Sequence, residues 1–121
     1  TNSTNISNTQ TSVATNSTNI STNTTDIATN TAAIQGLDKR IDRLDDKASR
    51  GIAIANAMEV FLPDPGKSFR MTVGGGFYGG QQAIGLTGSG RVTEDTAVYF
   101  GIGTDVSGLE FGGKVGVSFQ W

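Results

Sequence analysis

Residues 109–121 read Leu109-Glu-Phe-Gly-Gly-Lys-Val-Gly-Val-Ser-Phe-Gln-Trp121, and this stretch decides the fold. Successive side chains of a β-strand point to opposite faces, so Phe111, Val115 and Val117 share one face with the other large apolar residues. Glycine, lysine and serine occupy the other face. A strand of this length crosses a bilayer at a tilt. An apolar face opposed to a small or polar face is typical of an outer-membrane barrel strand, whose apolar face contacts lipid.

The same alternation recurs in three segments before this one, with turn signals between them. We predict four strands, at about 67–78, 81–92, 96–104 and 109–121. Arg70, Glu110 and Lys114 fall on the polar face, where we expect structural or pore-lining contacts. The shared apolar face collects Phe69, Met71, Val73, Phe77, Ile84, Leu86, Val98, Phe100 and Ile102. A soluble antiparallel sheet with one buried face would show the same alternation, but no other part of the chain supplies a second apolar layer.

Residues 1–34 consist mostly of Thr, Asn and Ser, and Asp26 is their only charged side chain. Such composition suggests disorder, but β-branched residues recur every seven positions, which predicts a left-handed coiled coil. This first seam position holds Ile6, Val13, Ile20, Ile27, Ile34 and Ile41. The second seam position, d, holds Asn2, Thr9, Asn16, Asn23 and Asn30, then Leu37 and Leu44. We therefore predict a coiled-coil stalk over residues 1–47, with asparagine specifying register at a cost in stability.

Residues 48–66 form a different kind of segment. Ala48 to Val60 favours helix but carries small side chains, including Gly51, Ala53 and Ala55. Pro63 and Pro65 then end the helix and start a turn. A helix so slim can pack inside a confined space, although a buried Ala-rich helix of a soluble core would look similar.

Four strands cannot close a barrel, and lipid does not tolerate an open sheet edge. Two chains would give eight strands, whose interior holds only side chains. Three chains of four strands give twelve, which leaves room for a slim three-helix bundle. The seam residues alone would permit a dimer, so the prediction of a homotrimer rests on closure. The expected fold class is an α+β membrane protein, in which a trimeric left-handed coiled coil leads into a 12-stranded antiparallel transmembrane β-barrel with helices filling the pore.

Composition excludes several function classes. The net charge of −2 predicts no nucleic-acid partner. Without cysteine there is no disulfide framework or thiolate metal site. Without histidine the commonest general base is missing, so an outer-membrane hydrolase or acyltransferase is not expected. No signal peptide opens the chain, and we expect it to be the C-terminal part of a longer precursor.

Taken together, these residues resemble the YadA-like anchor of trimeric autotransporter adhesins (type Vc secretion). The resemblance spans essentially the whole chain. The matching features are the repeat Ile27-Ala-Thr-Asn30-Thr-Ala-Ala-Ile34, the Leu37/Arg40/Ile41/Leu44 coiled coil, Arg50-Gly51-Ile52-Ala53 running to Ala57-Met58, Pro65-Gly66-Lys67, the glycine-rich first strand and the terminal aromatic.

The resemblance implies an outer-membrane domain that exports and tethers its own passenger, with the stalk at the cell surface and adhesion or virulence carried by an absent upstream head that binds a host or matrix ligand. It implies a central anion, commonly chloride, at Asn16, Asn23 and Asn30; no other cofactor is expected. Small residues at Gly74, Gly75, Gly76, Ala53 and Ala55 would serve passenger passage. Phe119 and Trp121 would be read by the barrel-assembly machinery. A trimeric fibre segment, such as a phage tail fibre without membrane insertion, remains the alternative.

Overall fold

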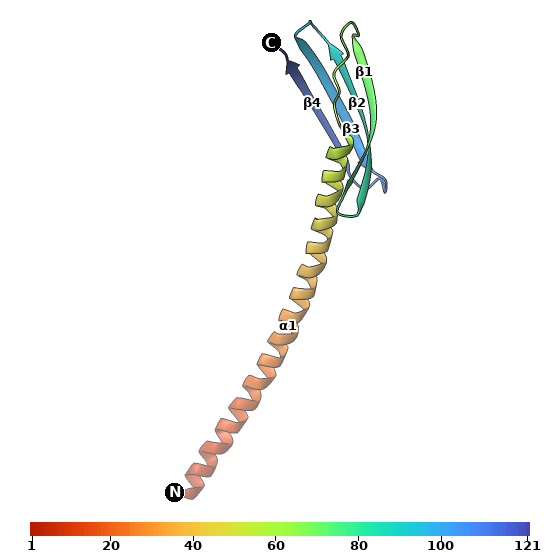
Figure 1. Cartoon of the computed structure of the whole chain (residues 1–121). Coiled ribbons are helices and arrows are strands. Elements are labelled where there is room, and N and C mark those ends of the chain that lie inside the picture. The colour runs from red at the N-terminus through yellow and green to blue at the C-terminus, as the bar shows by residue number, and fades with distance from the viewer. The chain divides into compact units, whose positions relative to one another are not determined.

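A computed structural model describes all 121 residues of the chain. It contains one long helix, α1 (Asn2–Ala57), followed by four strands: β1 (Phe69–Tyr78), β2 (Gln81–Arg91), β3 (Thr96–Asp105) and β4 (Phe111–Phe119). The fold is thus a helix followed by an antiparallel sheet, as expected (Figure 1). Two compact units divide the chain, Thr1–Ile41 and Asp42–Trp121.

The first unit is helical throughout, although threonine and asparagine are poor helix formers. Eight threonine hydroxyls donate hydrogen bonds to the carbonyl four residues earlier, for example Thr24 to Ile20 at 2.8 Å. These bonds satisfy the hydroxyls within the helix. The seam residues from Ile6 to Leu44 stay exposed on the single chain. No helix of the chain is both long enough and apolar enough to cross a membrane.

The four strands form one sheet in the order β1-β2-β3-β4, and every neighbouring pair is antiparallel. Their lengths of 10, 11, 10 and 9 residues suit a tilted crossing of a bilayer. Each strand begins and ends within two residues of its predicted position. The outer edges of β1 and β4 have no strand partner within this chain.

The helix ends at Ala57, three residues before the end of the segment with helical propensity. The amide of Met58 bonds the carbonyl of Ala55, three residues earlier, at 3.3 Å, which tightens and closes the last turn. Residues after Met58 leave the helix because their carbonyls are bound by side chains of the sheet, as described below. The helix also runs without a break through the expected division at residues 47 and 48.

The two faces of the sheet differ as the alternation predicts. The outer face, which points away from α1, carries large apolar side chains that stay exposed, including Val115 at 83% and Phe111 at 77%. The helix-facing face carries glycine, alanine, threonine and serine. The core lies here, where the last turns of α1 pack on the sheet (Figure 1), and consists of Ala53, Ile54, Ala57, Met58 and Ala83.

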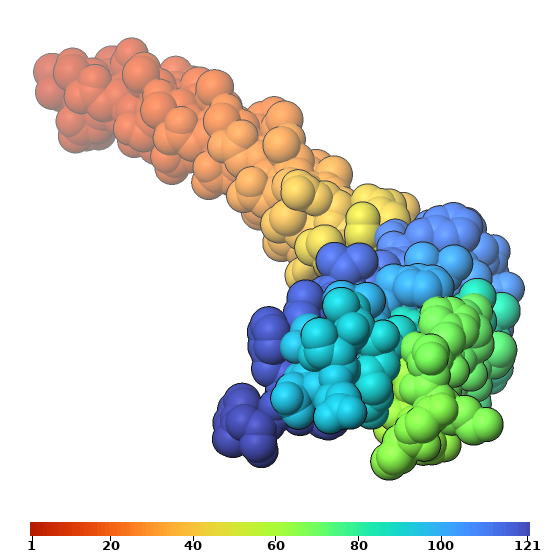
Figure 2. All heavy atoms as spheres, turned by 90° about the horizontal axis from the view of Figure 1, so that it is seen from above, coloured from red at the N-terminus to blue at the C-terminus, as the bar shows by residue number.

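Aromatic residues gather at both ends of the sheet. The β2–β3 turn, the start of β1 and the C-terminus share one end, with Phe69, Phe119 and Trp121. Figure 2 looks onto this end, with the β2–β3 turn in cyan and the C-terminal residues in dark blue. The opposite end, at the β1–β2 and β3–β4 turns, carries Tyr78 and Phe111.

Candidate functional site

The helix-facing glycines bring the backbone of α1 into direct contact with the sheet. A Cβ at Gly74 or Gly85 would lie 2.5 Å from the carbonyl oxygen of Ala57. A Cβ at Gly76 would overlap the carbonyl oxygen of Ala53. On β4, a Cβ at Gly112 would lie 2.9 Å from Ile54 Cγ2. Gly103 on β3 lies against the same Ile54 methyl group, so all four strands contribute a glycine to the surface that contacts the helix. Glycine is required at these positions because the helix lies so close to the sheet.

The structure separates the three glycines that the sequence had grouped. Gly74 and Gly76 face α1, whereas Gly75 faces outward, where the nearest atom to a built Cβ is 3.9 Å away. Ala53 is fully buried against Gly76, while Ala55 points away from the sheet and is exposed. Gly74, Gly76 and Ala53 thus form one contact, and Gly75 and Ala55 lie outside it.

Three side chains of β2 hold the segment that follows the helix. The hydroxyl of Thr87 donates to the carbonyl of Glu59 at 2.7 Å, and that of Ser89 to the carbonyl of Phe61 at 2.6 Å. Arg91 Nη2 donates to the carbonyl of Pro63 at 2.9 Å. Buried carbonyls need such partners. Residues 59–63 make no backbone hydrogen bonds to the sheet, so side chains supply the donors that this segment receives from the strands.

Arg70, the lumen candidate on β1, holds the same segment from the other side. Its Nη1 donates to the carbonyl of Leu62 at 3.4 Å and to Asp64 Oδ1 at 3.3 Å. Its guanidinium carbon lies 5.3 Å from the centroid of the Phe61 ring, within the range of a cation–π contact. Arg70 therefore makes structural contacts.

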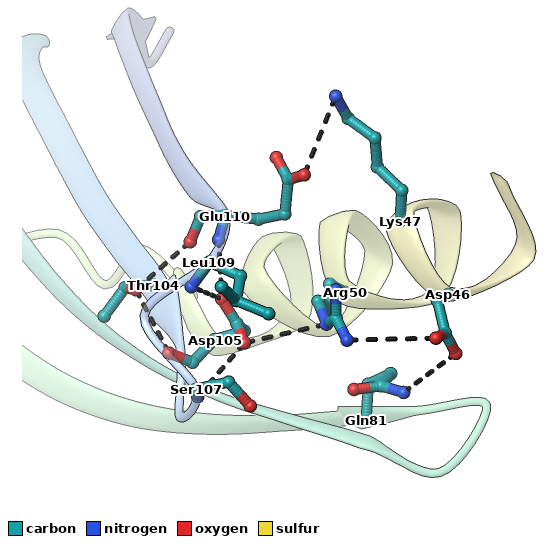
Figure 3. A network of polar contacts seen from close by, with 9 residues as sticks. All are labelled: Asp46, Lys47, Arg50, Gln81, Thr104, Asp105, Ser107, Leu109 and Glu110. Atoms are coloured by element: carbon teal, nitrogen blue, oxygen red, sulfur yellow. Dashed lines mark hydrogen bonds and ion pairs between the residues drawn. The ribbon is translucent and has the colours of Figure 1, made fainter. Parts of the chain in front are cut away.

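A second polar cluster lies where the helix meets the β3–β4 turn (Figure 3). The Asp105 carboxylate accepts hydrogen bonds from the amides of Ser107, Leu109 and Glu110, at 3.1, 2.9 and 2.7 Å. Asp105 is only 2% exposed, and its partner across the cluster is Arg50, whose Nε lies 3.7 Å from Oδ2. The carboxylate thus closes the turn and fixes the helix through one ion pair.

Two further contacts flank this ion pair. Asp46 Oδ2 lies 3.9 Å from Arg50 Nη2, and Asp46 Oδ1 accepts from Gln81 Nε2 at 3.3 Å, so the helix also reaches the β1–β2 turn. Lys47 Nζ lies 3.6 Å from Glu110 Oε1. The helix is therefore tied to both turns at this end of the sheet (Figure 3).

The remaining candidates lie apart from these contacts. Asn16, Asn23 and Asn30 are exposed on α1, seven residues apart. Phe119 ends β4, and Trp121 is fully exposed at the chain end. Lys114, half-buried on the helix-facing face, makes no ion pair.

Sequence analysis missed Asp105, Thr87, Ser89 and Arg91. Asp105 lies in one of the turns between the predicted strands, but the burial of its carboxylate gives no local signal in the sequence.

The outer face carries a shallow apolar hollow of about 530 Å³, lined by Val73, Ile84, Leu86, Ile102, Thr104 and Phe111 around glycines of the central strands. No charged side chain lines it. Its lining consists of apolar side chains and glycines, with Thr104 as the one residue that carries a hydroxyl.

Two comparisons with known proteins agree with this geometry. The sequence model of the YadA-like membrane anchor domain matches residues 61–121, just over half of the chain. The solid-state NMR structure of the membrane anchor domain of the trimeric autotransporter YadA is similar, with a TM-score of 0.64 and 27% sequence identity. That match covers 72% of this chain and 83% of the YadA chain. The helix followed by four antiparallel strands is therefore the anchor fold, and the chain belongs to the family of YadA-like membrane anchor domains.

Proposed function

We propose that three copies of this chain close a 12-stranded barrel in the bacterial outer membrane and anchor a trimeric autotransporter there. The observation that carries the proposal is the sheet itself. It joins an exposed apolar outer face, aromatic residues at both ends, and two unpaired edges. Lipid does not tolerate unpaired edges, and pairing β4 of one copy with β1 of the next removes all of them.

The three helix ends fill the pore. Ala53 and Ala57 are already buried on one wall, while Ile52 and Ala55 point away from it, toward the other two copies. The exposed seam of α1 is covered in the trimer by the same seam of the two partners. Barrel closure thus sets the threefold assembly, and a three-stranded coiled coil is compatible with it.

Before the helices fill it, the pore exports the upstream passenger, and afterwards it tethers that passenger at the cell surface, where an upstream head serves adhesion. Gly74 and Gly76 leave space for passage. Asn16, Asn23 and Asn30 converge on the trimer axis, where their amide N–H groups suit an anion such as chloride. Phe119 and Trp121 present the barrel-assembly signal. The domain carries out no catalysis.

The experiment expresses the chain in a Gram-negative host with a signal peptide and an N-terminal epitope. Outer membranes are fractionated, and migration on SDS gels is compared before and after boiling. We expect a heat-resistant species of three chains in the outer-membrane fraction, with the epitope accessible on intact cells.

The control removes residues 109–121, and with them β4, so that the barrel cannot close. If the unaltered chain forms a trimer that stays in solution without detergent, the chain is a fibre segment instead. If the unaltered chain is a soluble monomer, both the barrel and the anchor role are overturned.

A further inference from the structure

The contacts between β2 and the segment after the helix are regular. Donors occur at every second residue of β2, at 87, 89 and 91, and acceptors at every second residue of the partner segment, at 59, 61 and 63. Two residues of extended chain advance about 6.6 Å, so the two segments run parallel and stay in step. We call Thr87, Ser89 and Arg91 the β2 ladder.

The β2 ladder reads only backbone. All three bonds end on carbonyl oxygens, and the side chains of Glu59 and Phe61 remain exposed. No amide of the bound segment is used, so even Pro63 is accommodated. Every residue type carries a backbone carbonyl, and the β2 ladder therefore accepts extended polypeptide with little regard to sequence.

The neighbouring strands, and not the bound segment, hold the backbone of the donor residues. Thr87 is paired in the sheet with Thr72 on one side and Gly101 on the other. Thr87 and Ser89 are 3% and 2% exposed in the docked state. Arg91 is held independently by a bond from Nη1 to the carbonyl of Glu94 at 2.6 Å. Leaving buried hydrogen-bond donors unpaired costs free energy. When residues 59–63 are not bound, the three donors therefore favour binding of any extended chain whose carbonyls can reach them.

We infer that the β2 ladder is a binding site for extended polypeptide in transit through the pore, and that residues 59–63 are only its last occupant. The inference rests on the proposed export function. Successive passenger segments bind by alternate carbonyls, advance by two residues, and are replaced until the linker docks and export ends. The ligand class is unfolded polypeptide backbone.

The test uses disulfide trapping, since the chain has no cysteine of its own. Thr72→Cys supplies a reporter directly opposite Thr87 in the sheet register, on the same face, and leaves the ladder intact. A folded domain fused to the N-terminus stalls export, and single cysteines are walked through residues 1–30. We expect disulfides at alternate positions of the stalled segment, and a roughly tenfold lower yield in Thr87→Val/Ser89→Ala, from the loss of two hydrogen bonds.

Two variants serve as matched controls. Ser118 lies on the helix-facing side of β4, and its hydroxyl has no hydrogen-bond partner. Ser118→Ala should therefore leave the yield unchanged. Thr87→Ser/Ser89→Thr keeps both donors and should restore the trapping. The single variants Thr87→Val and Ser89→Ala each remove one bond, and heat resistance on gels verifies that each variant has assembled.

The possible outcomes distinguish failure of the β2 ladder inference from failure of the proposed export function. Normal surface exposure, with trapping that has no two-residue period or is unaffected by Thr87→Val/Ser89→Ala, would overturn the ladder inference alone. Failure of the unaltered chain to reach the surface would overturn the proposed export and the ladder with it.

Discussion

The two faces of the sheet reverse the arrangement of a soluble protein. On the outer face, bulky apolar residues such as Val73, Phe77 and Val115 are exposed. On the helix-facing face, glycine, threonine and serine are buried. Burial on this inner face depends on the absence of side chains, because the helix backbone itself fills the space. The comparison shows that residue size follows available room here, and that apolarity follows the proposed lipid contact.

The sharpest way to break this contrast is to add one methyl group to each face. Gly76→Ala places a Cβ into the backbone of Ala53 and Ala57, which cannot move without shifting the helix. We expect a loss of about 3 kcal/mol or more, the upper range for overpacking, seen as loss of the heat-resistant trimer on gels. Gly75→Ala on the outer face is the matched control and should assemble normally. Equal loss from both variants would contradict the helix contact.

A charge on the outer face tests the proposed contact with lipid. Val115→Lys lies near the middle of β4, and a lysine at the bilayer midplane costs about 2–4 kcal/mol. We expect a matching drop in the urea midpoint of the barrel refolded in phospholipid vesicles. Val115→Met, which keeps the site apolar, should change the midpoint little. If Val115→Lys were equally well tolerated, the outer face would contact water.

Arg50 lies near two carboxylates, the buried Asp105 and the exposed Asp46, whose contributions to stability can be compared. Asp105→Asn leaves the half-buried Arg50 guanidinium without its nearest anion and weakens the turn, so we expect a lower urea midpoint than for the parent, though the drop should be smaller than with Val115→Lys. Asp46→Asn changes an exposed carboxylate 3.9 Å from the same arginine and should have an effect near the error of the measurement. The reverse order would place the anchoring charge at Asp46.

Among the glycines of the helix-facing side, a smaller effect is expected at Gly116 than at Gly76. A Cβ at Gly116 would overlap the ring and hydroxyl of Tyr99, the far end of a side chain that can rotate. Gly116→Ala should therefore cost about 1 kcal/mol, the lower limit for overpacking, measured by the same urea titration. An effect as large as that of Gly76→Ala would show that Tyr99 is as rigid as the helix backbone.

The sheet could be predicted well from the sequence because alternation is a local property. The spacing of Phe111, Val115 and Val117 alone places them on one face of a strand. Gly79-Gly80 indicates a turn, and both glycines have positive φ in the structure. The helical repeat was equally readable, from isoleucine at a period of seven.

The contacts that join distant segments could not be predicted in the same way. Arg50 and Asp105 are 55 positions apart in the numbering and share no motif. By alternation, Thr87 and Ser89 fall on the face opposite Ile84 and Leu86, but their acceptors lie in a proline-containing segment whose sequence indicates only a helix end and a turn. Alternation already separates Gly74 and Gly76 from Gly75, but the sequence does not show how closely the helix backbone approaches the first two.

The chain traverses the length of the sheet an odd number of times. Asp46 lies beside Gln81 at one end, the helix and residues 59–63 run to the other, and four strands then follow. One pass plus four gives five, so Asp46 and Trp121 lie at opposite ends. This parity fixes sidedness by topology. If the sheet spans the outer membrane as proposed, Asp46 and the C-terminus face opposite compartments, and no rearrangement that keeps the strand order can bring them to the same side.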